Sequence, residues 1–129
     1  MILETIKTFI DADPNIRTAY LFGSVAKGTH TSTSDIDIAI ECEKKLTSAE
    51  KIHYIESLAL VTSRPIDLID LQTVGEPLLG QILTHGIRLK GTNTTHGSLL
   101  YKHMLATSDF YPYVQRLLKE RRNKWTGLL

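Results

Sequence analysis

The sequence has a single cysteine, no long apolar run and almost no net charge, and each absence excludes a class of protein. With Cys42 alone, neither an intramolecular disulfide nor a multi-cysteine metal site can form, which indicates a reducing, cytoplasmic setting and a packing role for this thiol. No apolar stretch is long enough to cross a bilayer, and Glu4 and Asp11 argue against a signal peptide. The formal net charge of +1 gives no reason to expect direct binding of nucleic acid.

Internal repeats and low-complexity tracts are also absent. The 129 residues suffice for one domain, and the 42% of hydrophobic residues is typical of a soluble globular protein. The five histidines do not have the spacing of metal ligands. Only His30 lies in a loop that borders the candidate site described below, and as a general base it is a minor alternative, because acids and metals suffice for such chemistry.

Apolar spacing predicts helices and strands in alternation along the chain. Helical periodicity is found in four segments: residues 2–11, residues 47 or 48 to about 61, residues 76–85, and residues 98–124 with a break near Pro112. Strand patterns are found at residues 18–22, 35–41, 66–71 and 87–90. Gly86 is expected to end the third helix. This order predicts an α/β or α+β sandwich, with one small sheet flanked by helices.

Two of these segments carry further expectations. The second helix is expected to begin after a capping Thr47 or Ser48. Its buried stripe is expected to consist of Ile52, Ile55, Ala59 and Leu60. After the strand at 18–22, a short helical turn is expected at 25–27, followed by a polar loop at 28–34.

The most informative stretch is Gly23-Ser24, followed after ten residues by Asp35-Ile36-Asp37. Residues i and i+2 of a strand point to the same face, so Asp35 and Asp37 are expected to project side by side. Two carboxylates this close repel each other, and a bound divalent cation removes the conflict. Mg²⁺ prefers hard oxygen ligands and often takes one or two carboxylates together with substrate phosphates. The pair therefore predicts a magnesium site.

The Gly23-Ser24 dipeptide lies at a predicted strand-to-helix junction. Glycine lets the backbone approach a ligand closely, the free N–H groups at a helix start attract phosphate, and the Ser24 hydroxyl adds a hydrogen bond. Lys27 is a further candidate for contact with a triphosphate, and Ser34 for orienting the Asp pair. A solvated lysine and a serine that caps a turn explain these two residues equally well.

A third carboxylate would complete a two-metal site. Asp67 and Asp70 both lie in the strand predicted at 66–71, and their odd separation places them on opposite faces. Asp67 is favoured because Ile66 and Leu68 would then pack inward while Asp67 faces the site. Asp70 is the fallback.

These residues resemble the signature of the polymerase-β nucleotidyltransferase superfamily, which is Gly-Ser, about ten residues, and then Asp-x-Asp. The spacing matches in full, and Ser34 matches the residue that usually precedes the first Asp. The later Arg-Pro-Ile-Asp-Leu-Ile-Asp-Leu resembles the third-acid strand of the family, whose first Asp, here Asp67, is normally the ligand. The family often has arginine where Lys27 stands, and lysine lacks the forked donor geometry.

The chain is similar in particular to the minimal nucleotidyltransferases, over roughly residues 1–91. The resemblance implies a polymerase-β-type fold for this core, with residues 92–129 as a C-terminal helical extension that packs on the core or on a partner. It implies Mg²⁺-dependent transfer of AMP from ATP, with two Mg²⁺ ions, to a tyrosine of a HEPN-domain ribonuclease toxin. The chain would then be the antitoxin, in a hetero-oligomer. The implied catalytic and metal-binding residues are Asp35, Asp37 and Asp67, and the implied nucleotide-binding residues are Gly23, Ser24, Lys27 and Ser34.

Two other functions stay open at this point. The chain could be an antitoxin that acts by binding alone, or a nucleotidyltransferase whose acceptor is a small molecule or an RNA end. Only about forty residues follow the signature region, which favours an acceptor supplied by a partner. Within those residues Tyr101, Tyr111 and Tyr113 are possible acceptors themselves. The basic residues Lys119, Arg121, Arg122 and Lys124 lie on a helix that is slightly better explained as packing on its own domain than as docking on a partner.

Overall fold

The structure is a computed structural model that describes residues 2–29, 34–107, 116, 118 and 119. Helices and strands alternate along it, as the apolar spacing predicts. The elements are α1 (Ile2–Ala12), β1 (Ile16–Phe22), α2 (Gly23–Lys27), β2 (Ile36–Cys42), α3 (Ser48–Thr62), β3 (Ile66–Asp70), α4 (Leu78–His85), β4 (Ile87–Lys90) and α5 (Asn93–Ala106). Within the described residues no helix is long and apolar enough to span a membrane.

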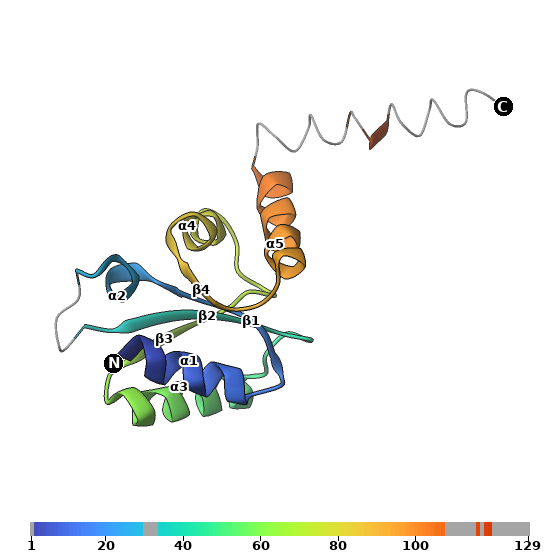
Figure 1. Ribbon diagram of the computed structural model, residues 1–129. Coiled ribbons are helices and arrows are strands. Elements are labelled where there is room, and N and C mark those ends of the chain that lie inside the picture. Colours follow the sequence, from blue (N-terminus) through green and yellow to red (C-terminus); the bar gives the residue numbers. More distant parts are fainter. Residues whose placement is uncertain (1, 30–33, 108–115, 117, 120–129) are drawn as a thin grey trace.

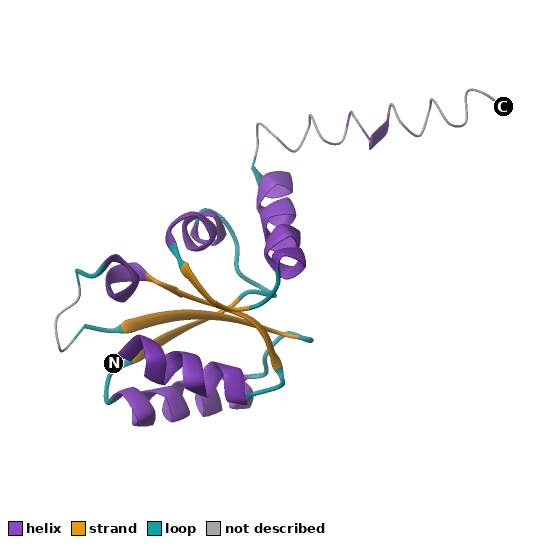
Figure 2. Ribbon diagram, in the orientation of Figure 1, coloured by secondary structure: helices purple, strands orange, loops and turns teal. Residues whose placement is uncertain are grey.

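The strands form one mixed sheet in the order β3-β2-β1-β4. Strand β1 is antiparallel to both of its neighbours, whereas β2 and β3 are parallel. Helices α1 and α3 cover one side of this sheet, and α4 and α5 lie on the other (Figure 1). The short helix α2 follows β1 at the end of the sheet and packs Val25 and Ala26 against the core on the side of α1 and α3. Figure 2 shows the strands as one layer between the two groups of helices. The prediction of a small mixed sheet flanked by helices, an α+β arrangement, is confirmed.

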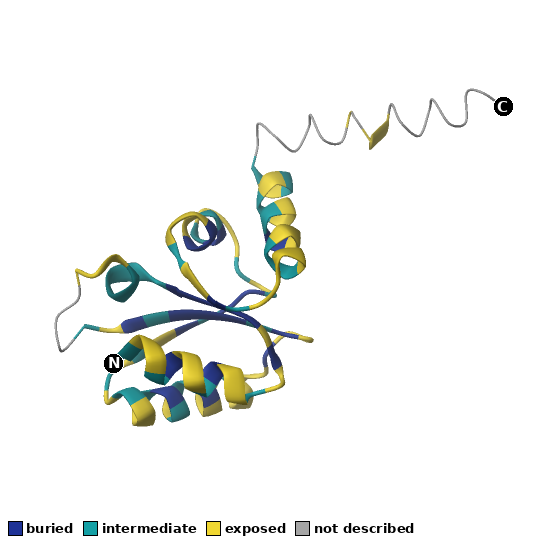
Figure 3. Ribbon diagram, in the orientation of Figure 1, coloured by how far each residue is buried: buried dark blue, intermediate teal, exposed yellow. Residues whose placement is uncertain are grey.

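The core has two parts, one on each side of the sheet, because side chains alternate along each strand. On β2, Ile36, Ile38 and Ile40 pack into the cluster beneath α1 and α3. The intervening Ala39 belongs to the opposite cluster, with residues of α4 and α5. The strands are buried and the outward sides of the helices are exposed (Figure 3). By this alternation Asp37 projects on the same side as Ala39, which is the side of α4 and α5.

The buried face of α3 differs in part from the predicted stripe: Ile55 packs against the core and Ala59 is partly buried, but the prediction was wrong for Ile52 and Leu60. Ile52 is 54% exposed and Leu60 is 82% exposed, while Tyr54 and Leu58 are buried. Apolar residues occur on several sides of this helix, so periodicity alone does not select one face. The large ring of Tyr54 and the side chain of Leu58, one turn apart, bury the most apolar surface against the sheet. The helix begins after Thr47, whose side chain and that of Glu50 form a capping box.

Several element boundaries also differ from the prediction. Strand β1 begins at Ile16 instead of residue 18, and α4 begins at Leu78 instead of residue 76. Helix α5 begins at Asn93, five residues before the predicted start, because Thr92 caps it reciprocally with Thr95. A threonine in place of Glu or Gln at the third helical position makes this cap hard to recognise in a sequence. The predicted break near Pro112 lies outside the described residues.

Gly86 does follow the last turn of α4, but not in the left-handed conformation that a terminal glycine usually adopts. Its φ is −75°, which any residue can adopt. A glycine is needed there because a Cβ atom would lie 2.4 Å from the Ile82 carbonyl oxygen and 3.2 Å from that of Leu21. The backbone at Gly86 therefore packs closely against β1 in the connection between α4 and β4.

Candidate active site

The candidate site is formed where three segments meet at one end of the sheet. In the parallel pair of β2 and β3, Asp37 stands opposite Asp67. In the antiparallel pair of β1 and β2, Asp37 also stands opposite Phe22, so Gly23 and Ser24 follow directly beside it. Asp35 immediately precedes β2. Asp35 and Asp67 are exposed and Asp37 is half-buried, so the three carboxyl groups line an open edge of the molecule.

Gly23 is in close contact with Asp37. It has a φ of +72°, in the left-handed region that side chains avoid, and a Cβ atom there would lie 2.0 Å from Asp37 Oδ2. Both the backbone conformation and the space therefore require glycine at this position. Gly23 follows Phe22, the last residue of β1, and begins α2, so the backbone of the Gly23-Ser24 turn lies against the carboxylate.

The electrostatics of the site centre on Asp37. The pKa of its carboxyl group is raised to about 6, first by burial, then by a hydrogen bond with Asp67 and by the negative charges of Asp67 and Asp35. A hydrogen bond between two carboxyl groups requires a proton between them. Asp37 and Asp67 therefore repel each other when both are ionised, and either a shared proton or a bound cation relieves this repulsion.

The donor set fits a divalent cation in its chemistry. Carboxylate oxygens are the hard ligands that Mg²⁺ prefers, and a cation would replace the shared proton between Asp37 and Asp67. Within the described part of the chain, no three His, Cys, Asp or Glu side chains are placed so that they form a ready-made metal site. Further ligands would therefore come from substrate phosphates and from Asp35 after its side chain turns, as is usual for Mg²⁺.

Residues 4–95 match the family model described as polymerase beta, nucleotidyltransferase. The chain belongs to this family. The Gly23-Ser24 turn and the acidic residues beside it all lie within the matched range.

Comparison with individual proteins places this nucleotidyltransferase near a group of antitoxins. It is 36% identical over 89 residues to the protein adenylyltransferase MntA of Shewanella oneidensis, and the match covers 69% of this chain and 64% of that protein. The matched part is thus a little under two thirds of the relative's length.

Two solved structures extend this likeness. A chain of a toxin–antitoxin crystal structure with AMP-PNP has a TM-score of 0.72 and 27% identity, and the match covers 99% of this chain and 98% of that one. A chain of a tri-AMPylated Shewanella oneidensis HEPN toxin in complex with its MNT antitoxin has a TM-score of 0.65 and 25% identity, again with 99% of this chain and 98% of that one covered.

The raised pKa of Asp37 gives the nucleotidyltransferase a measurable pH dependence. The unfolded carboxyl ionises near its usual 3.8 and the folded one near 6, so stability falls as pH rises from about 4 to 6 and stays lower above that. A shift of this size corresponds to roughly 3 kcal/mol for a fully buried group, and solvent screening of this half-buried carboxyl reduces it to about 1 kcal/mol.

Asp37→Asn is therefore expected to raise the free energy of unfolding by about 1 kcal/mol at pH 8, because the amide carries no charge to repel its neighbours. At pH 4, where the carboxyl is protonated in the folded protein, the gain should vanish. Urea denaturation in EDTA at the two pH values measures the difference. An equal change at both pH values would show that ionisation of Asp37 does not destabilise the fold.

Asp70, the fallback for the third acid, is used by the fold itself. It is 4% exposed, and its two carboxylate oxygens accept hydrogen bonds of 2.9 Å from the backbone N–H groups of Leu46 and Gln72. The odd separation from Asp67 turns it to the side of the sheet covered by α1 and α3. We therefore keep Asp67 as the candidate ligand and assign Asp70 a structural role.

Asp70→Ala is expected to lower the free energy of unfolding by about 2–4 kcal/mol, because it leaves two buried N–H groups without acceptors. Chemical denaturation measures this loss. Nucleotidyl transfer per folded molecule, at a temperature where the variant remains folded, should stay within a few-fold of the wild-type rate. A loss of transfer as large as that of an Asp67 variant would instead place Asp70 in the site.

The minor candidates lie around the edge of the site. Lys27 is exposed at the last position of α2, and Ser34 is half-buried directly before Asp35. The nucleotide-binding roles of these two residues stay predictions. His30, the minor candidate for a general base, lies outside the described residues.

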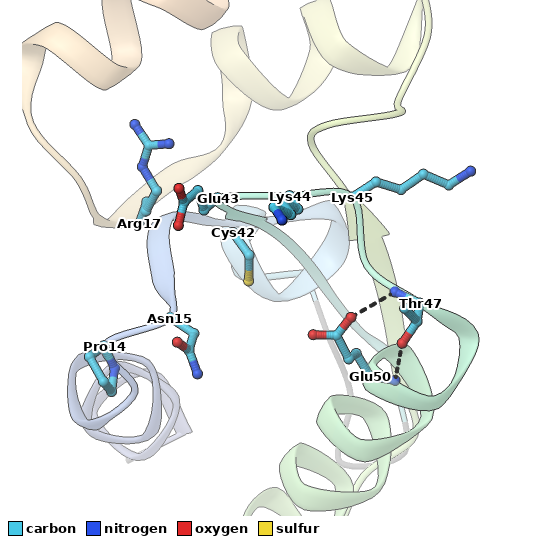
Figure 4. Close-up of a pocket in the computed structure, with 9 residues that line it drawn as sticks. All are labelled: Pro14, Asn15, Arg17, Cys42, Glu43, Lys44, Lys45, Thr47 and Glu50. Carbon is cyan, nitrogen blue, oxygen red and sulfur yellow. Dashed lines mark hydrogen bonds between the residues drawn. The ribbon is translucent and has the colours of Figure 1, made fainter.

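A cavity of about 580 Å³ opens at the opposite end of β2, about 17 Å along the strand from Asp37. Sequence reasoning did not predict it, because its lining combines the loop after α1 with the loop after β2 (Figure 4). Two of its polar residues serve the fold, since Glu50 and Thr47 form the capping box of α3. Burial raises the pKa of the Cys42 thiol, which makes it a poor nucleophile at neutral pH. The cavity is therefore separate from the candidate chemistry.

Proposed function

We propose that this chain is a protein adenylyltransferase that transfers AMP from ATP to a tyrosine hydroxyl of a HEPN-domain toxin and thereby acts as its antitoxin, in the cytoplasm. The placement of Asp37 opposite Asp67, against the backbone of Gly23, carries the proposal. Membership of the nucleotidyltransferase family supports the chemistry. The likeness to MntA and to antitoxin chains in toxin complexes supports the protein acceptor.

We assign the metal-binding role to Asp35, Asp37 and Asp67. Mg²⁺, with two ions in our proposal, would supply positive charge that stabilises the attacking and leaving oxygens. The proton between Asp37 and Asp67 would leave when the cation binds, since both carboxylates must be ionised to act as ligands.

The remaining residues of the site bind and orient the nucleotide. The backbone and hydroxyl of Ser24, in the turn that Gly23 allows, would hold triphosphate oxygens, with Lys27 and Ser34 at the edge. The tyrosine oxygen attacks the α-phosphorus of ATP, a P–O bond forms to the tyrosine, and the bond to pyrophosphate breaks. The hydroxyl proton passes to the carboxylate nearest the acceptor. Positioning and charge neutralisation supply most of the rate enhancement.

The two alternatives differ from this proposal in what they require. Neutralisation by binding alone would need none of the acidic residues at the site edge. Transfer to a small molecule or an RNA end would need an acceptor site on this chain. The likeness to a protein adenylyltransferase and to chains of toxin–antitoxin structures favours an acceptor on the partner instead.

The test is transfer of label from α-labelled ATP to a HEPN-domain toxin, which is first sought among the genes beside the one that encodes this chain. We expect labelled toxin and a mass increase equal to one or more AMP groups with Mg²⁺, no label with EDTA, and no label from γ-labelled ATP. A toxin that binds the chain without gaining mass would favour neutralisation by binding alone. Label that appears on RNA or a small molecule, and not on the toxin, would overturn the proposed acceptor.

A further inference from the structure

We propose that the outward face of α5, formed by Gly97, Tyr101 and Met104, is the surface on which the partner protein docks while it presents its acceptor tyrosine. This inference rests on the proposed function and adds to it the place of contact. We expect an apolar surface of the HEPN-domain protein to occupy this face. A second copy of this chain is the main alternative occupant.

The candidate catalytic carboxylate Asp37 and helix α5 lie on the same side of the sheet. Asp37 projects on the side that α4 and α5 cover, as the alternation with Ala39 shows. Helices α4 and α5 lie on that side, away from α1 and α3 (Figure 1). Helix α5 is held toward the other end of the sheet, where Lys102 Nζ donates to the carbonyl oxygen of Leu71, just after β3. A protein that presents its acceptor hydroxyl to the carboxylates from this side of the sheet can therefore also contact α5.

The inner face of α5 is fixed to the core, so the outer face is held in a defined position. His96 Nδ1 forms a 2.6 Å hydrogen bond with the buried Tyr20 hydroxyl, and Leu99 is 4% exposed. One turn further, His103 Nδ1 lies 2.7 Å from Glu76 Oε1, before α4. Lys102 Nζ donates to the Leu71 carbonyl oxygen. A surface that is rigid before binding loses little entropy when a partner docks.

The outer face carries residue types that favour protein contacts. Tyr101 is 51% exposed and Met104 is 42% exposed, and they follow Gly97 at helical spacings of four and three, which places them on one stripe. Tyrosine and methionine are enriched in the buried parts of protein interfaces, whereas Glu and Asp are depleted there. Neither α4 nor α5 contains an acidic residue.

Gly97 is unusual because it stands inside a helix, where glycine is less stable than alanine. A Cβ atom at this position would meet no atom within 4 Å, so packing within the described residues gives no reason for a glycine. Close approach by the backbone of a partner helix would give one. At Gly80 the opposite holds, since a Cβ atom there would lie 2.6 Å from the ring of His103.

The comparisons agree with a partner-binding role for α5. The family model ends at residue 95, in the first turn of this helix. The likeness to chains of toxin–antitoxin structures covers 99% of this chain and therefore includes all or nearly all of α5. The helix is thus shared with chains that were crystallised with a toxin, beyond the part that defines the enzyme family.

The test compares two double variants that each place two glutamates on exposed helical positions. The docking variant is Tyr101→Glu with Met104→Glu. The control is Ile52→Glu with Leu60→Glu, on α3 across the sheet, where the side chains are 54% and 82% exposed. Each is assayed for affinity to the HEPN-domain toxin identified in the test of the proposed function, for AMP transfer to it, for melting temperature and for mass in solution.

We expect the docking variant to bind the toxin at least tenfold more weakly, with an unchanged melting temperature and with transfer that recovers at high toxin concentration. The control should bind and transfer as the wild type does. Gly97→Ala should raise the melting temperature of the chain and weaken toxin binding. Recovery at high concentration separates weaker docking from a damaged active site.

Three results would overturn the inference. Wild-type affinity in the docking variant would do so, as would an equal loss in the α3 control. A wild-type dimer that the docking variant converts to a monomer, with toxin binding intact, would assign the face to a second copy of the chain. If the wild-type protein neither binds nor modifies the toxin, the proposed function itself is overturned. The wild-type measurement therefore separates a failure of the proposed function from a failure of the docking inference.

Discussion

Replacing Asp35 and Asp37 together with alanine is expected to reduce AMP transfer by at least about 10³-fold, which corresponds to roughly 4 kcal/mol of lost transition-state stabilisation. The change removes two of the three proposed metal ligands, and with them the charge neutralisation that phosphoryl-type transfer requires. The fold should be retained, because Asp37 is half-buried among like charges that raise its pKa, and its removal relieves that repulsion. Transfer from α-labelled ATP and circular dichroism measure the two quantities.

The matched control for this variant is Glu41→Gln, which removes another acid on the same side of β2 without touching the site. Its transfer rate should be unchanged. The double alanine variant should still bind the toxin, since docking and chemistry are carried by different residues. Full transfer by the double variant would remove these residues from catalysis. If that variant loses transfer and still protects cells as well as the wild type does, neutralisation by binding alone would be the function.

Replacing Gly23 with alanine is expected to lower transfer by at least about 100-fold, even though one methyl group is added. The left-handed conformation alone costs an alanine roughly 1–2 kcal/mol. At Gly23 the new Cβ atom would also lie 2.0 Å from Asp37 Oδ2, so either the carboxylate or the turn must move. Both are parts of the proposed catalytic geometry, and a displacement of about 1 Å is enough to reduce a rate by this amount.

Gly28→Ala separates the conformational cost from the contact. Gly28 has a φ of +73°, almost equal to the +72° of Gly23, and a Cβ atom there would meet nothing within 4 Å. Both alanine variants should therefore lose a similar amount of stability from the backbone, and only Gly23→Ala should lose most of its transfer rate. Denaturation curves and initial rates of transfer measure the two effects. Equal rates in the two variants would show that contact between Gly23 and Asp37 does not matter for catalysis.

The candidate site combines two kinds of requirement that oppose each other. The fold would be more stable without the negative charge at Asp37, and the chemistry requires that charge. Glycine at position 23 permits the close approach that makes the conflict sharper. A residue type that lowers the stability of the fold at its position suggests that function requires it there. The same reasoning singles out Gly97 on α5, where glycine weakens a helix and no contact within the described residues explains it.

The sequence by itself determined the local features of this protein. The period of two along residues 35–41 placed Asp37 apart from Ile36 and Ile38, and the odd separation of Asp67 and Asp70 separated an exposed acid from a buried one. These conclusions depend on the geometry of a single strand, which is fixed by neighbouring residues alone. The segment from Gly23-Ser24 to Asp37 indicated the family by its resemblance to a known signature, which lies within one continuous stretch of the sequence.

Only the tertiary structure decided which segments lie together. The parallel pairing of β2 with β3 places Asp67 opposite Asp37, and the antiparallel pairing with β1 places Gly23 against the same carboxylate. The buried face of α3 and the start of α5 were also decided by packing and by a threonine cap that a sequence pattern does not reveal. Strand order and helix faces depend on contacts between residues far apart in the chain, and local periodicity carries no information about those contacts.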